Sequence, residues 1–271
     1  LNLSLRRDEG GTTLRSLELR AGQLSASASG KVSSEGSSLS GTVDLGDLSA
    51  LGPGYAGSLS LQGGFDGTPQ AGKLKLDGTG QSLRSGNAEL DRLLAGQSRI
   101  LLRLAVADGT LQIDDGRFET PQLRAAVTGR IRGDTRDLTL DARLANLALL
   151  APGFTGPLTV KGNATQDASG YRLDLAGSGP GQVNARVSGR LSNDFASASL
   201  AIRGTGRAEL ANLVISPRAA SGPVSYDLTL NGPLTLSSLG GRVTLSGGRI
   251  TDPDLGLSLD AVEAIADIRS G

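Results

Sequence analysis

Apolar and polar residues alternate along most of this sequence, and this period of two constrains the fold more than any other feature. Leu102, Leu104 and Val106 form one such run, which ends at a turn-forming Asp108-Gly109 step. Successive side chains of a strand point to opposite faces, so each run has one apolar and one polar face. Asp-Gly and Gly-rich steps between runs are typical of hairpin turns. The sequence therefore predicts an all-β chain of short antiparallel strands.

The spacing of these runs also predicts a large, curled sheet. Further turns are expected at Asp114-Asp115-Gly116 and at Arg132-Gly133-Asp134. At one strand and turn per ~10–12 residues, the chain has room for about 22 strands. A sheet of that size twists and curls, and an apolar face must curl inward. We expect an elongated, repetitive sheet curled into an open β-helix-like trough with an apolar lining, although alternation alone does not distinguish an open trough from a closed core.

Helical signals are scarce. One short helix is expected near residues 87–95, where Leu90, Leu93 and Leu94 share a face. Asn87 would be its N-cap and Gly96 its C-cap. Residues 257–268 resemble a capping box at their start but continue a strand pattern, and a strand is the favoured interpretation.

The chain repeats internally. Residues 45–63 align with residues 144–162 without a gap, at an offset of 144 − 45 = 99, and the same offset aligns residues 30–32 with 129–131 and residues 74–78 with 173–177. A weaker and shorter third copy follows. The copies cover about residues 24–100, 123–180 and 183–236, which predicts one continuous repeat segment over residues 1–271 with no separate globular domain.

Composition excludes most catalytic chemistry. The chain has no His and no Cys, which rules out a Ser-His-Asp triad, a Cys nucleophile and a His-ligated zinc site. A Ser-Lys pair would need Lys31, Lys73, Lys75 or Lys161, and each has the position of a solvated polar-face lysine. We therefore expect no enzymatic activity, no cofactor and no metal.

Two acidic steps were weighed as calcium sites, namely Asp114-Asp115 and Asp252-x-Asp254. Aspartate in a turn more commonly accepts local backbone hydrogen bonds, and that interpretation is favoured at both. Charge is balanced at 27 basic against 27 acidic residues, so no nucleic-acid partner is expected.

The apolar residues are mostly Leu, Val and Ala, with only 3 Tyr and 4 Phe and with 40 Gly. This composition suits a thin, repetitive interior better than a thick globular core, which normally depends on aromatic side chains. The chain contains no Met and starts within an alternating run, so we expect it to be an internal segment of a longer protein. Inside it, no apolar run approaches the ~20 residues of a membrane-spanning helix.

The apolar face itself is the candidate functional site. Alternating Leu and Val are usually core, but a long lining without aromatic side chains matches acyl chains in shape and polarity, and an unclosed trough would expose more apolar surface than soluble proteins tolerate. The predicted lipid-binding lining consists of Leu102, Leu104, Val106, Leu111, Ile113, Leu123, Val127, Ile131, Leu138, Leu140, Leu144, Leu158, Val160, Leu173, Leu175, Val183, Val187, Leu191, Leu228, Leu230, Val243 and Leu245.

Several segments resemble the TamB family, a component of the bacterial translocation and assembly module that belongs with the AsmA-like and bridge-like lipid-transfer proteins. The segments are residues 87–96, 109–113, 120–131, 146–158 and 248–257. The resemblance implies a β-taco, a long sheet folded into a trough with an apolar lining, and it carries over no catalytic residue.

The same resemblance implies a place in the periplasm, with an anchor in the inner membrane outside this chain. It implies phospholipid movement between the two membranes and a role in outer-membrane protein assembly. An outer-membrane β-barrel partner would bind through regions outside this segment.

Three functional hypotheses remain open on the sequence. The first is a lipid conduit, with acyl chains along the apolar face and head groups in solvent. The second is a chaperone-like scaffold that receives unfolded outer-membrane or autotransporter client strands by strand addition. The third is an adhesin or autotransporter stalk built as a closed β-helix, in which the apolar residues would be dry core.

Overall fold

The chain folds into one open sheet of 18 strands, as a computed structural model of residues 2–8, 11–33 and 35–269 shows. Every strand pair whose register is defined is antiparallel, which confirms the predicted all-β class. The sheet is not closed into a barrel, so the closed core that the stalk hypothesis requires is absent from the described residues.

The strands are β1 (Asn2–Asp8), β2 (Gly11–Ala21), β3 (Leu24–Val32), β4 (Ser37–Leu45), β5 (Tyr55–Gly67), β6 (Ala71–Ser85), β7 (Gln97–Ala107), β8 (Thr110–Glu119), β9 (Leu123–Arg132), β10 (Thr135–Leu144), β11 (Leu158–Asp167), β12 (Gly170–Gly179), β13 (Val183–Leu191), β14 (Ala198–Arg207), β15 (Ala219–Ser221), β16 (Pro223–Gly232), β17 (Leu239–Asp252) and β18 (Leu257–Ile268).

The strands number 18 rather than about 22 because several are longer than the spacing suggested. Strand β5 has 13 residues, β6 has 15 and β17 has 14. Residues 257–268 form β18, as favoured. The chain divides by its internal contacts into two compact units, residues 1–138 and residues 139–271, which are described separately below.

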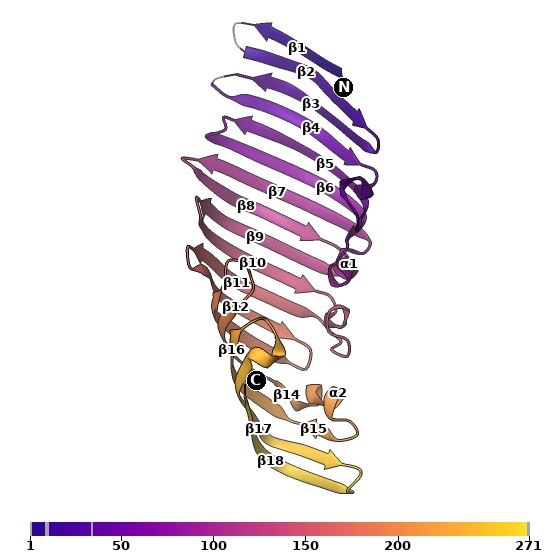
Figure 1. Cartoon of the computed structure of the whole chain (residues 1–271), viewed down its shortest axis with the longest axis vertical. Coiled ribbons are helices and arrows are strands. Elements are labelled where there is room, and N and C mark those ends of the chain that lie inside the picture. Colours follow the sequence, from indigo (N-terminus) through magenta and orange to yellow (C-terminus); the bar gives the residue numbers. More distant parts are fainter. Residues whose placement is uncertain (1, 9–10, 34, 270–271) are drawn as a thin grey trace. The chain divides into compact units, whose positions relative to one another are not determined.

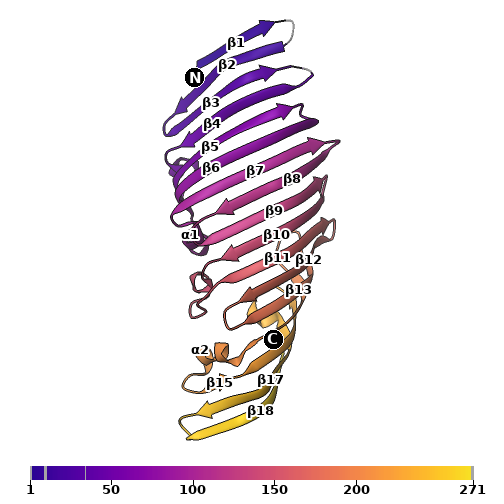
Figure 2. The ribbon, with the colours of Figure 1, turned by 180° about the vertical axis from the view of Figure 1, so that it is seen from behind.

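Unit 1 is a meander in which each strand pairs with the next along the chain (Figures 1 and 2). Its strands end at two different rims. The hairpin rim carries the short β1–β2, β3–β4, β5–β6 and β7–β8 connections. The helical rim carries the β2–β3, β4–β5, β6–β7 and β8–β9 connections, among them the 3-10 turn η1 (Leu48–Leu51) and helix α1 (Ala88–Leu94).

Helix α1 confirms the predicted helix and its N-cap. The Asn87 side chain accepts a hydrogen bond from the Leu90 N–H at 3.0 Å. The C-cap is Ala95 rather than Gly96, which follows it with a φ of 92°. Glycine is favoured there because that left-handed conformation costs it nothing.

Unit 2 is also a meander, interrupted between β14 and β16. That connection holds η3 (Ala208–Ala211), helix α2 (Asn212–Ile215) and the short strand β15, which pairs with β17. The 3-10 turns η2 (Leu147–Leu149) and η4 (Leu236–Ser238) lie in two other connections. None of these four helical elements has a periodic apolar signal long enough to be predicted. No helix in the described part of the chain has the length and hydrophobicity needed to cross a membrane.

The sequence repeat is also a repeat of local geometry. Asp47 and Asn146, which are 99 residues apart, cap η1 and η2 with nearly the same backbone angles. Each side chain accepts the N–H two residues further on, Asp47 from Ser49 at 2.8 Å and Asn146 from Ala148 at 3.1 Å. The aligned glycines Gly30, Gly129 and Gly189 also share one conformation, with φ of 142°, 148° and 142°.

The turn predicted at Asp114-Asp115-Gly116 is wrong. These residues lie within β8, where the register against β7 shifts between Arg103 and Leu104. One extra residue is thereby accommodated as a β-bulge, which keeps the strand paired on both sides of it. The predicted turns at Asp108-Gly109 and at Gly133-Asp134 do form.

The polar face is held together by pairs across neighbouring strands. In unit 1, Ser27 and Thr42 hydroxyls lie 2.8 Å apart and Ser38 donates to Asp66 at 2.7 Å. In unit 2, Arg203 contacts Asp227 at 3.0 Å and Arg242 contacts Asp267 at 2.9 Å. Exposed cross-strand pairs of this kind each contribute roughly 0.2–1 kcal/mol.

Candidate functional site

The register gathers the apolar residues of unit 1 on one face. Directly opposed residues of an antiparallel pair lie on the same side of the sheet, so each pairing extends a row. One row crosses β2 to β9 through Leu17, Ala28, Gly41, Gly63, Leu76, Leu102, Gly116 and Val127. A neighbouring row crosses the same strands through Leu14, Gly30, Leu39, Phe65, Leu74, Leu104, Ile113 and Gly129. The two rows belong to a continuous apolar face.

No described element of unit 1 covers the middle of this apolar face. Within the described parts of β1–β9, no large apolar side chain is buried. Those on the face between the rims are half-buried, except Leu3 and Leu5 of β1, which are exposed. Each leucine is shielded by its neighbours along and across the strands and keeps its remaining surface open. Contiguous apolar surfaces on proteins commonly mark interaction sites, so we take this face as the candidate site.

The apolar face of unit 1 is hollowed where its small residues meet. Gly41 pairs with Gly63, and Ala28 pairs with Gly41, so three neighbouring positions lack a large side chain. The hollow has a volume of about 340 Å³. Its apolar walls are Leu17, Ala26, Leu39, Val43, Leu61, Phe65, Leu74 and Leu76.

A second hollow of about 580 Å³ lies on the polar face of the same strands. Its lining includes the side chains of Arg15, Glu18, Gln62, Lys75 and Asp77. This hollow is larger, but water solvates its hydroxyl and charged groups well. Displacing that water therefore gains little free energy. The apolar hollow gains free energy from losing water, and we take it as part of the candidate site.

Unit 2 has an apolar face built in the same way. One row crosses β11 to β17 through Gly162, Leu175, Val187, Ile202, Leu228 and Gly241. The next row crosses Ala164, Leu173, Gly189, Leu200, Leu230 and Leu239. This face is more covered than that of unit 1, because Ala164, Ala198, Leu230 and Leu245 are buried.

All predicted lining residues lie in strands at apolar-face positions. Leu102, Leu104, Val106, Leu111, Ile113, Leu123, Val127, Ile131 and Leu138 belong to unit 1, and the others to unit 2. In β10, the alternate residues Thr139 and Asp141 contact Asn163 and Lys161 of β11 on the polar face. Leu140 and Leu144 therefore point to the apolar side. Leu144 is 4% exposed and serves as core, whereas Leu140 is half-buried.

The walls of the apolar hollow are absent from the predicted lining. Leu39, Leu61, Phe65, Leu74 and Leu76 were not among the predicted residues, although all lie on the same face. The signal that could have found four of them is the repeat. Leu74 and Leu76 align with Leu173 and Leu175 at the 99-residue offset, Leu61 aligns with Val160, and Leu39 aligns with Leu138.

The four lysines considered for a Ser-Lys pair lie on the polar face of the strands. Lys31, Lys73, Lys75 and Lys161 all occupy polar-face positions in strands, opposite Ser38, Asp66, Gly64 and Ala176. Within the residues that the structure describes, no three acidic, His or Cys side chains gather as a metal site would require.

Asp252 shows why an acidic turn need not be a metal site. Its Oδ1 accepts the N–H groups of Asp254 and Leu255, and its Oδ2 accepts from Arg218 Nε at 2.7 Å. The hydrogen bond from Arg218 holds the pKa of the Asp252 carboxyl below its usual range. The favoured interpretation of a local backbone acceptor therefore describes this residue well.

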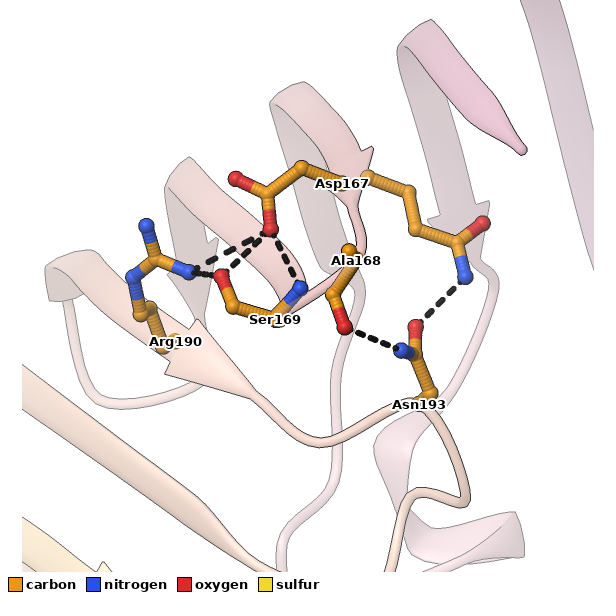
Figure 3. Close-up of polar contacts among 6 residues, drawn as sticks. Asp167, Ala168, Ser169, Arg190 and Asn193 are labelled. Carbon is orange, nitrogen blue, oxygen red and sulfur yellow. Dashed lines mark hydrogen bonds and ion pairs between the residues drawn. The ribbon is translucent and has the colours of Figure 1, made fainter. Parts of the chain in front are cut away.

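A cluster joins the β11–β12 and β13–β14 turns (Figure 3). These turns and the β16–β17 connection form the hairpin rim of unit 2, and the β10–β11, β12–β13 and β14–β16 connections form its helical rim. Asn193 donates to the Ala168 carbonyl at 3.4 Å, while Gln166 donates to Asn193 Oδ1 at 2.5 Å. The Ser169 N–H and hydroxyl donate to Asp167, which holds the pKa of that carboxyl below its usual range. Near this cluster the rings of Tyr171 and Phe195 stack with centroids 5.3 Å apart. These contacts fix the β13–β14 turn against the β11–β12 turn.

No protein-family model matches this sequence, and no curated protein is significantly similar to it.

Proposed function

We propose that this chain is a segment of a bridge that carries phospholipid acyl chains along its apolar faces between two membranes. The observation that carries the proposal is the uncovered, half-exposed apolar face of unit 1. A soluble chain that keeps such a face open needs an apolar ligand or partner to cover it. Acyl chains suit it because the face is lined by aliphatic side chains with few rings, and the two rows that cross its middle carry no polar side chain that a tail would leave unsatisfied.

The free energy gained by burying an acyl chain on this face is enough to retain a phospholipid but not to hold it permanently. Each methylene that leaves water contributes ~0.8 kcal/mol, so ten methylenes in full contact would contribute about 8 kcal/mol. An open face removes only part of each methylene from water, which lowers that value. A ligand held this loosely can move from one row of leucines to the next.

The resemblance to the TamB family leads us to extend the proposal to the periplasm of a Gram-negative cell. The bridge would run between the inner and outer membranes and support outer-membrane protein assembly. A β-barrel protein of the outer membrane would bind through regions outside this segment. These assignments rest on the resemblance, whereas the acyl-chain ligand rests on the apolar face.

The test is native mass spectrometry of the purified chain after incubation with phosphatidylethanolamine vesicles. The wild-type chain should retain phospholipid. The double variant Leu74→Asp, Leu104→Asp should lose it, because each substitution places a carboxylate in the apolar face of unit 1. Thr79→Asp is the matched control, since Thr79 lies on the polar face opposite Arg99, and it should retain lipid. Undiminished lipid in the double variant would overturn the proposal.

A photo-crosslinker at Leu104 separates the conduit from the chaperone-like scaffold. The conduit predicts adducts with phospholipid, while a scaffold for unfolded client strands predicts adducts with protein. Leu104 suits this purpose because it lies on the apolar face, paired with Leu74 and Ile113.

A further inference from the structure

The two rims of unit 1 differ in how they close the apolar face. Among the described residues of unit 1, the buried apolar side chains are Leu48 and Leu93, at 8% and 9% exposure. Both belong to helical turns at the helical rim, η1 and α1. The buried polar side chains Ser98 and Thr120 lie at the strand ends of the same rim. Among the described residues of unit 1, side-chain burial is therefore confined to the helical rim.

Hydrogen bonds hold helix α1 against the apolar face at the helical rim. Thr120 Oγ1, at the end of β8, donates to the Leu93 carbonyl at 2.7 Å. The Ser85 N–H donates to Asp91 at 2.6 Å, and the Ser82 N–H donates to the Gly96 carbonyl at 2.8 Å. Ser98 is fully buried at a position that faces the apolar side. The helix thus seals the ends of β6, β7 and β8.

The hairpin rim of unit 1 has no comparable cover. Its connections are short turns such as residues 68–70 and 108–109, and their described residues contain no helical element. The last apolar row before this rim, Val106, Leu111 and Ile131, remains half-buried. Charged side chains of both signs lie at these strand ends and turns, namely Lys31, Asp66, Lys73, Asp108, Arg130 and Arg132.

We propose that a phospholipid on the apolar face of unit 1 lies with its acyl ends toward the helical rim and its head group at the hairpin rim. This inference rests on the proposed function and adds a direction to it. A head group at the helical rim would have to displace the packed Leu48 and Leu93 and leave its charges poorly hydrated. At the hairpin rim it stays in water, because the described turns there bury no large side chain.

The two rims of unit 2 do not differ in this way. Its buried apolar residues lie toward both rims, since Leu144 and Ala208 are near the helical rim, while Ala164 and Ala198 are near the hairpin rim. The stacked Tyr171 and Phe195 also occupy the hairpin rim there. The inference is therefore confined to unit 1.

The experiment uses the absence of Trp from the natural sequence. Single tryptophans replace Val32, which is 42% exposed at the hairpin rim, or Leu90, which is 50% exposed in α1 at the helical rim. Each variant of the full chain is mixed with phosphatidylcholine that carries a nitroxide quencher either on the choline head or near the end of an acyl chain. Ser29→Trp, on the polar face, is the control for quencher free in solution.

The head-labelled lipid should quench Val32→Trp more than Leu90→Trp, and the tail-labelled lipid should show the reverse order. Ser29→Trp should lose little fluorescence with either lipid. Equal quenching at both rims, or head-label quenching that is stronger at Leu90→Trp, overturns the orientation and leaves the proposed function standing. Absence of quenching at both reporters by both lipids overturns the orientation and the acyl-chain ligand together.

Discussion

Gly189 of β13 faces Leu200 of β14, and their backbones approach so closely that a Cβ on Gly189 would overlap the carbonyl oxygen of Ser199. Its φ of 142° is also a conformation that side-chain-bearing residues rarely adopt. Gly30 and Gly129 meet the carbonyl oxygens of Ser38 and Asp137 in the same way. This close approach is therefore a feature of all three copies of the repeat.

Gly189→Ala should destabilise unit 2 by about 3 kcal/mol, because it adds both a steric overlap and backbone strain. The measurement is hydrogen exchange of the β13 and β14 amides. Gly179→Ala is the matched control, since its Cβ would meet only Leu158 and Val183 at 3.6 and 4.0 Å. Equal protection of β13 and β14 in the two variants would contradict the role given to Gly189.

Ser98→Ala should stabilise unit 1 by about 1 kcal/mol. The Ser98 hydroxyl is fully buried, and its Oγ has no hydrogen-bond partner in the described part of the chain. Removing an unsatisfied buried polar group removes its desolvation cost. Hydrogen exchange of the β7 amides, measured as a function of urea concentration, reports the urea midpoint at which β7 opens. This midpoint should rise in Ser98→Ala. Ser29→Ala, at an exposed polar-face position, should leave it unchanged, and a fall for Ser98→Ala would show that the hydroxyl has a partner.

Asn146→Ala should destabilise the β10–β11 connection by roughly 1–2 kcal/mol, whereas Asn146→Asp should cost little. The Asn146 oxygen accepts the N–H groups of Ala148 and Gly156, at 3.1 and 3.0 Å. A carboxylate can accept both, as Asp47 does for Ser49 at the aligned position. Proteolysis within residues 147–156 measures the loosening. If Asp and Ala prove equally damaging, the repeated cap is not what holds this loop.

Acid should weaken the contact between Arg218 and Asp252. The hydrogen bond from Arg218 depresses the folded pKa of Asp252 below the usual 3.8, so its contribution is present above that value and lost as the pH falls through the folded pKa. The urea midpoint of unit 2 should therefore fall less between about pH 6 and about pH 2 in Asp252→Asn than in the wild-type chain. Asp108→Asn, in an exposed turn of unit 1, should follow the wild type. Identical pH dependence in all three chains would refute the coupling.

Alternation was enough to predict strands, faces and most hairpins, because the period of a strand does not depend on its neighbours. It failed at Asp114-Asp115-Gly116, where an acidic Gly-containing step suggested a turn. The phase of the apolar positions changes there, from Leu111 and Ile113 to Gly116 and Phe118, and a single added residue in a continuing strand produces such a change.

The uneven cover of the rims was not predictable. Leu48 lies in η1, which is too short for a periodic signal, and although helix α1 was predicted, the burial of its Leu93 depends on how α1 packs. The apolar hollow was missed for a different reason. It arises where glycines of separate strands, Gly41 and Gly63, come into register, and register between strands is not encoded in either strand alone.

The meander pairing has a consequence for how each unit comes apart. Except around β15, each strand in a unit is bonded only to the strands that precede and follow it. An outermost strand can then peel away while the interior ladder survives, as expected of a quasi-one-dimensional array. Denaturation within a unit becomes a moving boundary rather than a single concerted event, and the free energy of opening rises with distance from the nearest edge.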